Sequence, residues 1–171
     1  RASRANMHKW LALSALIVVA DQVTKFFAVQ QLAGSGAVAV TSYFNLVLVY
    51  NAGAAFSFLS DAAGWQRGFF IGIALVASVW IVYLLRRHPQ QRWFALALSL
   101  VLAGAVGNVI DRVLHGAVID FLDFHAYGYH WPAFNVADSA ISCGAALLIW
   151  DAFRPKGRNE GGGMSNEGAG V

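Results

Sequence analysis

The chain has 171 residues, of which 58% are hydrophobic and 12% are charged. Soluble domains carry roughly 25% charged residues, so the composition excludes an ordinary soluble domain and indicates an integral membrane protein with a single domain over residues 1–171. The formal net charge is +3; in a membrane protein the basic residues report topology first, and we expect no nucleic-acid partner.

The first predicted element is a transmembrane helix over about residues 10–29, because its apolar run reaches the roughly 20 residues that a helix needs to cross a bilayer. Asp21 and Lys25 share one face of this helix, with the acid first, which is the favourable order. The simpler interpretation is an ion pair between them; the alternative is a direct part in shaping a site. Met7 is a plausible start, and the sequence leaves open whether residues 1–6 are native.

The next predicted element is a small β region outside the bilayer, over about residues 37–60. From Ala37 to Tyr50 the chain is rich in Val, Tyr, Phe and Leu with partial alternation, which favours a strand over a helix. Asn51-Ala52-Gly53 follows as a turn signal. We therefore expect a small extracytoplasmic β-sheet beside the helices.

The second and third predicted transmembrane helices cover about residues 67–85 and 93–113. Asn108, Asp111 and Arg112 stand at i, i+3 and i+4 of the third helix, so they form one polar stripe. Charged residues in a membrane span usually face the bundle interior. There the stripe either holds a substrate through its amide and guanidinium donors or forms an ordinary buried polar network, and the spacing favours neither interpretation.

Residues 115–132 are predicted to form an outer loop or short helix, and about residues 136–153 a fourth transmembrane helix. Asp120 lies in the loop and Asp138 near the start of the helix, so two acids approach the same face of the bilayer. Acids at a membrane are costly and indicate function. This pair suggests an aspartyl protease.

Each of these acids also has a simpler interpretation. Asn135 followed by Asp138 ahead of an apolar run resembles a helix N-terminal capping box, which spacing alone favours for Asp138. Asp120 is equally consistent with a surface acid, and Asp123 competes with it for a catalytic assignment. The spacing of the residues does not choose between Asp120 and Asp123.

Basic residues flank one side of the predicted bundle. Cytoplasmic ends of membrane helices are enriched in Lys and Arg, and nine of the 12 Lys and Arg fall at the ends that share this side: Arg1, Arg4, Lys9, Arg86, Arg87, Arg92, Arg154, Lys156 and Arg158. We therefore expect both termini in the cytoplasm, the acids at the outer face, and a disordered cytoplasmic tail over residues 154–171. The predicted fold class is an all-α membrane protein with four transmembrane helices, a small extracytoplasmic β-sheet and a periplasmic loop or helix.

Three other functions are consistent with parts of this pattern. A small proton-coupled transporter or channel subunit would use the ionisable residues of the helices as a relay, but the inner halves of the first three helices contain no Asp, Glu, Lys, Arg or His to continue it. A non-catalytic membrane assembly factor would tolerate replacement of the acids. A metal site would need ligands at a recognised spacing, which His115, Asp120, His125 and His130 do not provide.

Five short motifs follow one another in the chain: Asp21-Gln22-x-x-Lys25, Asn51-x-Gly53-x-Ala55-Phe56, Gly107-Asn108-x-x-Asp111-Arg112, Val118-Ile119-Asp120-Phe121 and Phe134-Asn135-x-Ala137-Asp138. Together they resemble lipoprotein signal peptidase, also called signal peptidase II, and only the two termini fall outside the resemblance. The resemblance implies a bacterial inner-membrane aspartyl endopeptidase. Such an enzyme removes the signal peptide from diacylglyceryl-modified prolipoproteins and cleaves before the lipidated cysteine.

The resemblance also implies roles for individual residues. Asp120 and Asp138 would be the catalytic pair, and Asp123 a solvated loop carboxylate. Substrate positioning would fall to Asn51, Asn108, Arg112 and Asn135, and support of the site to Asp21, Lys25, Asp111 and Gly53. The expected partners are the diacylglyceryl-modified prolipoprotein and membrane lipids, with no metal, no organic cofactor and no obligate protein partner. The enzyme would be a multi-pass protein with its active site at the periplasmic face.

Overall fold

The computed structural model describes residues 2–53 and 65–154. It contains four helices: α1 (Ala2–Leu32), α2 (Trp65–Arg87), α3 (Arg92–His115) and α4 (Val136–Phe153). All of them are long and apolar enough to cross a membrane, α1 over Asn6–Leu32, which confirms the four predicted transmembrane helices. The expected disordered tail from residue 155 onward and the end of the predicted β region from residue 54 lie outside the described residues.

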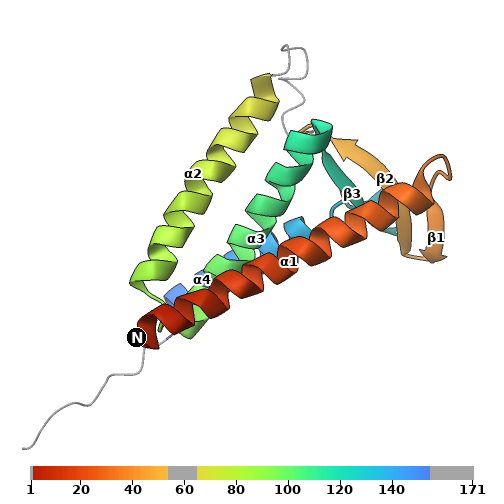
Figure 1. The fold of residues 1–171 in the computed structure, drawn as a ribbon. Helices are drawn as coiled ribbons and strands as arrows, with labels where there is room; N and C mark the ends of the chain where they lie inside the picture. Colours follow the sequence, from red (N-terminus) through yellow and green to blue (C-terminus); the bar gives the residue numbers. More distant parts are fainter. Residues whose placement is uncertain (1, 54–64, 155–171) are drawn as a thin grey trace, which may run out of the picture.

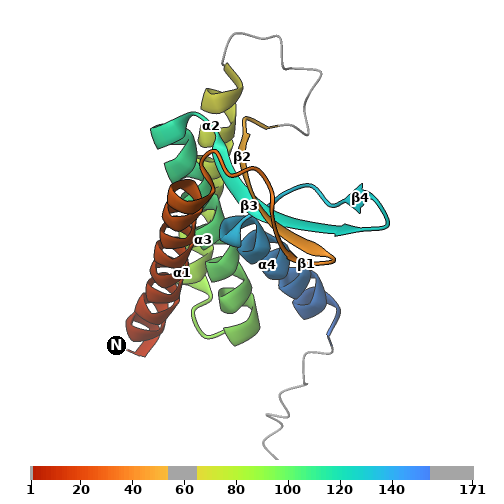
Figure 2. The same cartoon turned by 90° about the vertical axis from the view of Figure 1, so that its right-hand side faces the viewer.

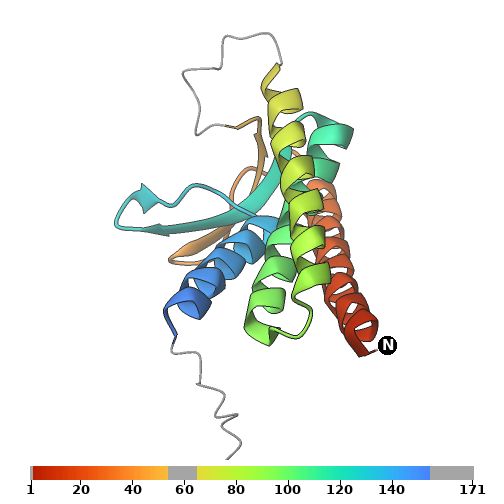
Figure 3. The ribbon, with the colours of Figure 1, turned by 90° about the vertical axis from the view of Figure 1, so that its left-hand side faces the viewer.

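Helix α3 is the central helix of the bundle, with the other three arranged around it (Figures 1 and 3). Half of its apolar window is buried, compared with 11–22% for the other helices. Its buried side chains are mostly small, including Ala95, Ala97, Ser99, Ala103 and Ala105. Small residues let neighbouring helices approach closely, and close approach gives van der Waals contact where lipid removes the hydrophobic driving force.

Two glycines show how closely α3 and α4 approach. A Cβ added at Gly104 of α3 would collide with the backbone carbonyl of Ala137 in α4, and one added at Gly144 of α4 would lie 2.8 Å from the backbone oxygen of Ala97 in α3. Neither backbone can move aside without shifting a whole helix. The start of α4, where Asp138 lies, is therefore fixed against α3.

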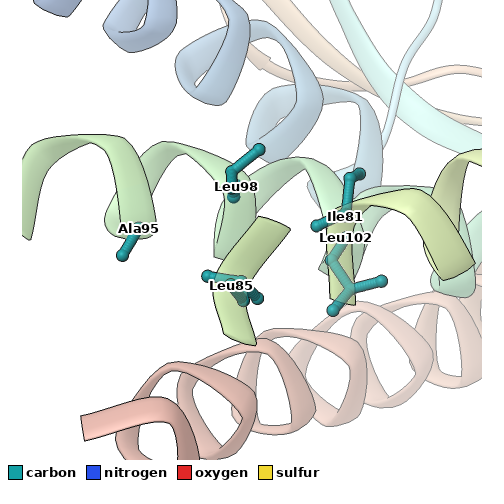
Figure 4. Packing of buried hydrophobic residues seen from close by; sticks show 5 residues of the cluster. All are labelled: Ile81, Leu85, Ala95, Leu98 and Leu102. Atoms are coloured by element: carbon teal, nitrogen blue, oxygen red, sulfur yellow. The ribbon is translucent and has the colours of Figure 1, made fainter. Parts of the chain in front are cut away.

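An apolar cluster joins α2 to α3 at the other side of the bundle (Figure 4). Ile81 and Leu85 of α2 pack with Ala95, Leu98 and Leu102 of α3. Leu85 and Ala95 are fully buried. The α2–α3 connection is short, and this cluster fixes the angle between the two helices.

An antiparallel four-stranded sheet lies beside the helices, in the order β1 (Val38–Thr41), β2 (Phe44–Asn51), β3 (Val118–Ala126) and β4 (Tyr129–His130). The predicted strand region is thus confirmed as part of a sheet. In the register of β2 with β3, Asn51 faces Val118 and Val49 faces Asp120. This pairing brings the end of the first outer segment to the strand that carries Asp120.

The segment 115–132, expected as a loop or short helix, instead forms strands β3 and β4. Its alternating sequence from Val118 to Ala126 finds a partner in β2, far away in the chain. Tyr127 and Gly128 both have positive φ angles, 51° and 82°, which is the backbone of the tight turns that join hairpin strands. The resulting β3–β4 hairpin extends away from the helices (Figures 2 and 3).

Candidate active site

Asp120 and Asp138 reach the site from different elements. Asp120 is the third residue of β3, and Asp138 lies in the first turn of α4. Phe134, two residues before α4 begins, is held on β3. Its N–H donates to Leu122 O, and its carbonyl oxygen accepts the N–H groups of Phe121 and Leu122. These three hydrogen bonds bring the start of α4 beside β3, and the charge of Asp138 acts on Asp120.

Asp120 is only 1% exposed, and both of its oxygens accept hydrogen bonds. Asn51 Nδ2 donates to Oδ2 at 3.0 Å and Asn135 Nδ2 to Oδ1 at 2.7 Å. Burial raises the pKa of Asp120 to about 6, and the charge of Asp138 adds to the rise, while the two asparagine hydrogen bonds oppose it. A carboxyl group with this pKa exchanges its proton near neutral pH, as an acid–base catalyst requires.

Asp138 is not the residue that caps α4. Asn135 is the N-cap, and its Oδ1 accepts the backbone N–H of Asp138 at 2.8 Å. The carboxylate of Asp138 is directed elsewhere and accepts a hydrogen bond from Asn108 Nδ2 at 2.8 Å. The capping pattern seen in the sequence therefore describes Asn135, and it leaves the side chain of Asp138 available at the site.

Asn135 contacts both acids with one fully buried side chain. Its Oδ1 holds the backbone of Asp138, and its Nδ2 donates to Asp120 and to Ile119 O at 3.1 Å. Both ends of the amide are therefore used by the site itself. Asn51 and Asn108 likewise donate to Asp120 and Asp138, so the three predicted asparagines surround the acids.

A buried charged network lies behind the acids. Lys25 Nζ is 2.8 Å from Asp21 Oδ2 and 2.6 Å from Asp111 Oδ2, and all three side chains are at most 2% exposed. The predicted Asp21–Lys25 ion pair is confirmed, but its second carboxylate, Asp111, comes from α3 and was not expected as a partner. Gln22, to which the sequence assigned no role, donates to Asp21 and Asp111 as well.

This network holds the backbone immediately before each acid. Asp21 Oδ1 accepts the N–H of Ala137 at 2.8 Å, and Asp111 Oδ2 accepts the N–H of Ile119 at 3.1 Å. Ala137 precedes Asp138, and Ile119 precedes Asp120. One lysine thus joins two carboxylates, each of which fixes one of the two candidate catalytic segments.

Arg112 and Gly53 border the same site. The Arg112 guanidinium interacts electrostatically with Asp138, Asp111 and Asp120, and it lies 5.1 Å from the ring centroid of Phe70. Gly53 has a φ of 109°, and a Cβ there would lie 2.7 Å from Phe70. Its N–H donates to Asn51 Oδ1, so this turn fixes the amide that contacts Asp120.

Asp123 lies on the opposite side of β3 from Asp120, because side chains alternate along a strand. The expectation that it is a solvated loop carboxylate is wrong: it is 6% exposed and accepts hydrogen bonds from Asn45 and from His130 Nδ1. The hydrogen bond with His130 lowers its pKa below the ordinary value. The structure therefore separates the two acids that sequence spacing left equivalent.

No group of three or more His, Cys, Asp and Glu side chains is placed to hold a metal ion in the part of the chain that the structure describes. His125 and His130 stack on each other with ring centroids 4.9 Å apart, in the hairpin. The oxygens of Asp120 accept hydrogen bonds from the side-chain amides of Asn51 and Asn135.

Comparison with known proteins adds a family to this geometry. The sequence model described as Signal peptidase (SPase) II matches residues 13–154. A lipoprotein signal peptidase of Janthinobacterium sp. (strain Marseille) is 54% identical over 156 residues, which cover 91% of this chain and 94% of the relative. One from Cupriavidus necator is 59% identical over 145 residues, covering 85% and 83%.

Similarity extends to solved structures. A bacterial membrane enzyme structure determined by the in meso method at 1.9 Å resolution superposes with a TM-score of 0.77 and 32% identity, over 87% of this chain and 95% of that one. A second such structure, at 2.3 Å resolution, gives a TM-score of 0.73 and 31% identity. The second match covers 88% of this chain and 93% of that one.

Proposed function

Since this chain belongs to the signal peptidase II family, we propose that Asp120 and Asp138 are its catalytic pair. The chain is an aspartic endopeptidase of the membrane that processes lipoprotein precursors. The observation that carries the assignment is that two acids from β3 and α4 meet inside a ring of amide donors from Asn51, Asn108 and Asn135. The alternative of a transporter or channel subunit has no support from the family.

The environments of the two acids suggest different roles. Asp120 is buried and has a pKa raised to about 6, so it is the group that holds the proton of the pair. Asp138 is half-buried and has access to water. In the proposed mechanism Asp138 takes a proton from the attacking water while Asp120 donates its proton to the scissile carbonyl oxygen.

The pair then returns to its starting state. Attack by the water oxygen gives a neutral tetrahedral gem-diol, with no covalent bond to the enzyme. Asp138 passes the proton it took to the leaving nitrogen, the C–N bond breaks, and a hydroxyl proton returns to Asp120. Two acids held close share one proton because like charges disfavour a second ionisation, and the apparent pKa values belong to the pair.

The substrate proposal is a diacylglyceryl-modified prolipoprotein, cleaved before its lipidated cysteine. The site lies beside the sheet, where the ends of α3 and α4 meet β3, so a scissile bond can enter while the acyl chains stay in lipid. Arg112 interacts electrostatically with both acids, which supports a role for its guanidinium in binding the substrate backbone. The asparagine side chains position the acids.

The localisation proposal follows from charge. The N-terminus of α1, the α2–α3 connection and the C-terminus of α4 lie at one end of the bundle (Figures 2 and 3). Lys9, Arg86, Arg87, Arg92 and Arg154 belong to this basic end. By the positive-inside rule it faces the cytoplasm, which leaves the sheet and the acids at the periplasmic face of the inner membrane.

The test is cleavage of a purified prolipoprotein by wild type, Asp120→Asn and Asp138→Asn in detergent, with thermal unfolding recorded for each. We expect both variants to fold and to lose at least about 1,000-fold in kcat, because each acid moves a proton in the reaction. Asp123→Asn is the matched control, since it changes a buried acid of the same strand. Full activity in Asp120→Asn or Asp138→Asn would contradict the assignment.

The lipid requirement needs a separate comparison. The same prolipoprotein is supplied with and without its diacylglyceryl group. If the lipid is recognised, the unmodified precursor should show a much lower kcat/KM with wild type. Equal cleavage of both forms would refute the lipid part of the proposal while leaving the catalytic pair intact.

A further inference from the structure

A groove of about 870 Å³ lies on the bundle between α1, α2 and α3, away from the acids. Most of its lining is apolar and comes from Leu11 to Val19 of α1, Ser78 to Arg86 of α2 and Leu102 to Val106 of α3. Helices α1 and α2 diverge toward the end of the bundle opposite the N-terminus of α1 (Figure 1). The groove occupies the region where they are still close, beside the apolar cluster of Figure 4.

The length of the groove corresponds to one leaflet of a bilayer. Its walls extend from Leu11 to Val19 and from Ser78 to Arg86, a rise of about 12 Å along each helix. Half of the hydrocarbon thickness of a bilayer is about 15 Å, whereas a helix that crosses the whole membrane is about 30 Å long. The groove therefore suits an acyl chain of the leaflet on the basic side of the bundle.

The mouth of the groove is cationic. Arg86 is exposed and lines the groove at the C-terminal end of α2, with Arg87 beside it stacked over Tyr83 at 5.4 Å. Within residues 2–53 and 65–154, the ion pairs involve other residues and leave Arg86 without a carboxylate. Lys9 adds further positive charge at this end.

We propose that this groove binds a phospholipid with an anionic headgroup, with an acyl chain between α1 and α2 and the phosphate at Arg86. Basic pockets between transmembrane helices on the cytoplasmic side bind acidic headgroups for the same reason. The two serines of the lining, Ser14 and Ser78, already donate to backbone carbonyls, so the walls present no free hydroxyl proton to hydrocarbon. This site is separate from the catalytic one and does not depend on it.

The apolar segment of the substrate is the competing occupant, and the observations disfavour it. A signal peptide begins with a positively charged region ahead of its apolar run, which would meet Arg86, Arg87 and Lys9 at the basic end. Like charges repel there, whereas an anionic phosphate is attracted. The apolar length of the groove is also shorter than a membrane-crossing helix requires.

The experiment compares dioleoyl phosphatidylglycerol with dioleoyl phosphatidylcholine on the purified full chain in detergent, with bound lipid read by native mass spectrometry. The two probes share acyl chains and differ in headgroup charge. Arg86→Gln removes the headgroup contact, and Arg92→Gln is its control, because Arg92 is at the same end but lines another pocket. Ala15→Trp fills the groove, and Ala12→Trp places the same bulk on α1 outside the lining.

We expect wild type to bind the anionic lipid about fivefold more tightly than the zwitterionic one, which is the contribution of one basic residue near a headgroup. Arg86→Gln should remove this preference and Arg92→Gln should keep it. Ala15→Trp should reduce binding of both lipids, and Ala12→Trp should not. Equal effects of the two arginine variants, or of the two tryptophan variants, would overturn the proposal.

A cleavage assay on the same variants separates the two occupants. If the groove holds lipid, Ala15→Trp should keep the wild-type KM for prolipoprotein in detergent. A raised KM together with unchanged lipid binding would assign the groove to the apolar segment of the substrate. That result would also overturn the proposal, and it would leave the assignment of Asp120 and Asp138 untouched.

Discussion

Asp120 shows how opposing effects set the chemistry of one residue. Burial favours its neutral form and the neighbouring Asp138 adds to this, while amide donors from Asn51 and Asn135 favour the carboxylate. The balance places its pKa at about 6. The asparagines therefore do more than hold the acid in place, because they keep the proton exchangeable near neutral pH.

This balance predicts a pH dependence. The folded pKa of Asp120 is above its ordinary value of 3.8, so its proton is lost as pH rises through about 6, and kcat/KM should fall on that alkaline limb. Bound substrate excludes water and raises the pKa further, so the limb in kcat should lie at higher pH. Initial rates from about pH 4 to 9 at several substrate concentrations measure both limbs.

Replacing Asn51 by Ala should move that limb upward by roughly one pH unit, because a hydrogen bond to a charged group contributes about 1.5–3 kcal/mol and part of it is replaced by water. Asn45→Ala is the matched control: Asn45 is on the same strand and donates to Asp123 instead. A limb that moves equally in both variants would show that the Asn51 amide does not tune Asp120.

The network of Asp21, Lys25 and Asp111 connects several helices and strands. It joins α1 to α3 through the Lys25–Asp111 ion pair and then reaches the backbone of α4 and β3. Asp21 and Asp111 share a single lysine, so removing Lys25 leaves two buried carboxylates with no ammonium group between them. A like-charged pair left in a buried site is strongly unfavourable.

Lys25→Met should therefore destabilise the fold by about 3–5 kcal/mol, with cleavage lost as the segments before Asp120 and Asp138 loosen. Thermal unfolding in detergent measures the effect, and Lys9→Met on the exposed face of α1 is the control. Adding Asp21→Asn and Asp111→Asn to Lys25→Met should recover part of the stability, because asparagine can still accept both backbone N–H groups. No recovery would argue against charge imbalance as the cause.

The contact between α3 and α4 gives a second prediction for the elements. Gly104→Ala puts a methyl group against the Ala137 carbonyl, and overpacking of this kind costs about 1–3 kcal/mol. Because Ala137 precedes Asp138, kcat/KM for cleavage should fall even where the variant remains folded. Gly72→Ala on α2, where an added Cβ meets nothing within 4 Å, is the control, and equal behaviour of the two variants in unfolding and cleavage would contradict the prediction.

Across the whole molecule, the basic end and the sheet lie at opposite sides of the hydrophobic helices. This arrangement predicts which residues an impermeant reagent reaches in intact cells. In a Cys143→Ala background, Tyr127→Cys at the 94% exposed hairpin turn should react with an impermeant maleimide without lysis. His88→Cys, at the exposed α2–α3 connection, should react only after the inner membrane is opened, and the reverse pattern would invert the proposed orientation.

The sequence by itself determined the membrane class, the four spans, the strand at β2 and the residue types of the site. Apolar length and charge bias are local properties of the chain, and they need no partner to be recognised. The five motifs indicated the family before any geometry was known. The ion pair of Asp21 with Lys25 could be predicted for the same reason, since a spacing of four residues on a helix is local.

Only the tertiary structure decided how these residues are used. Strand β3 was not predicted because its hydrogen-bonding partner is β2, far away in sequence. The choice between Asp120 and Asp123 depends on which side of β3 faces the start of α4, and the second carboxylate on Lys25 comes from another helix. Spacing along the chain reports one element at a time, whereas proton sharing and charge balance are set by distances between elements.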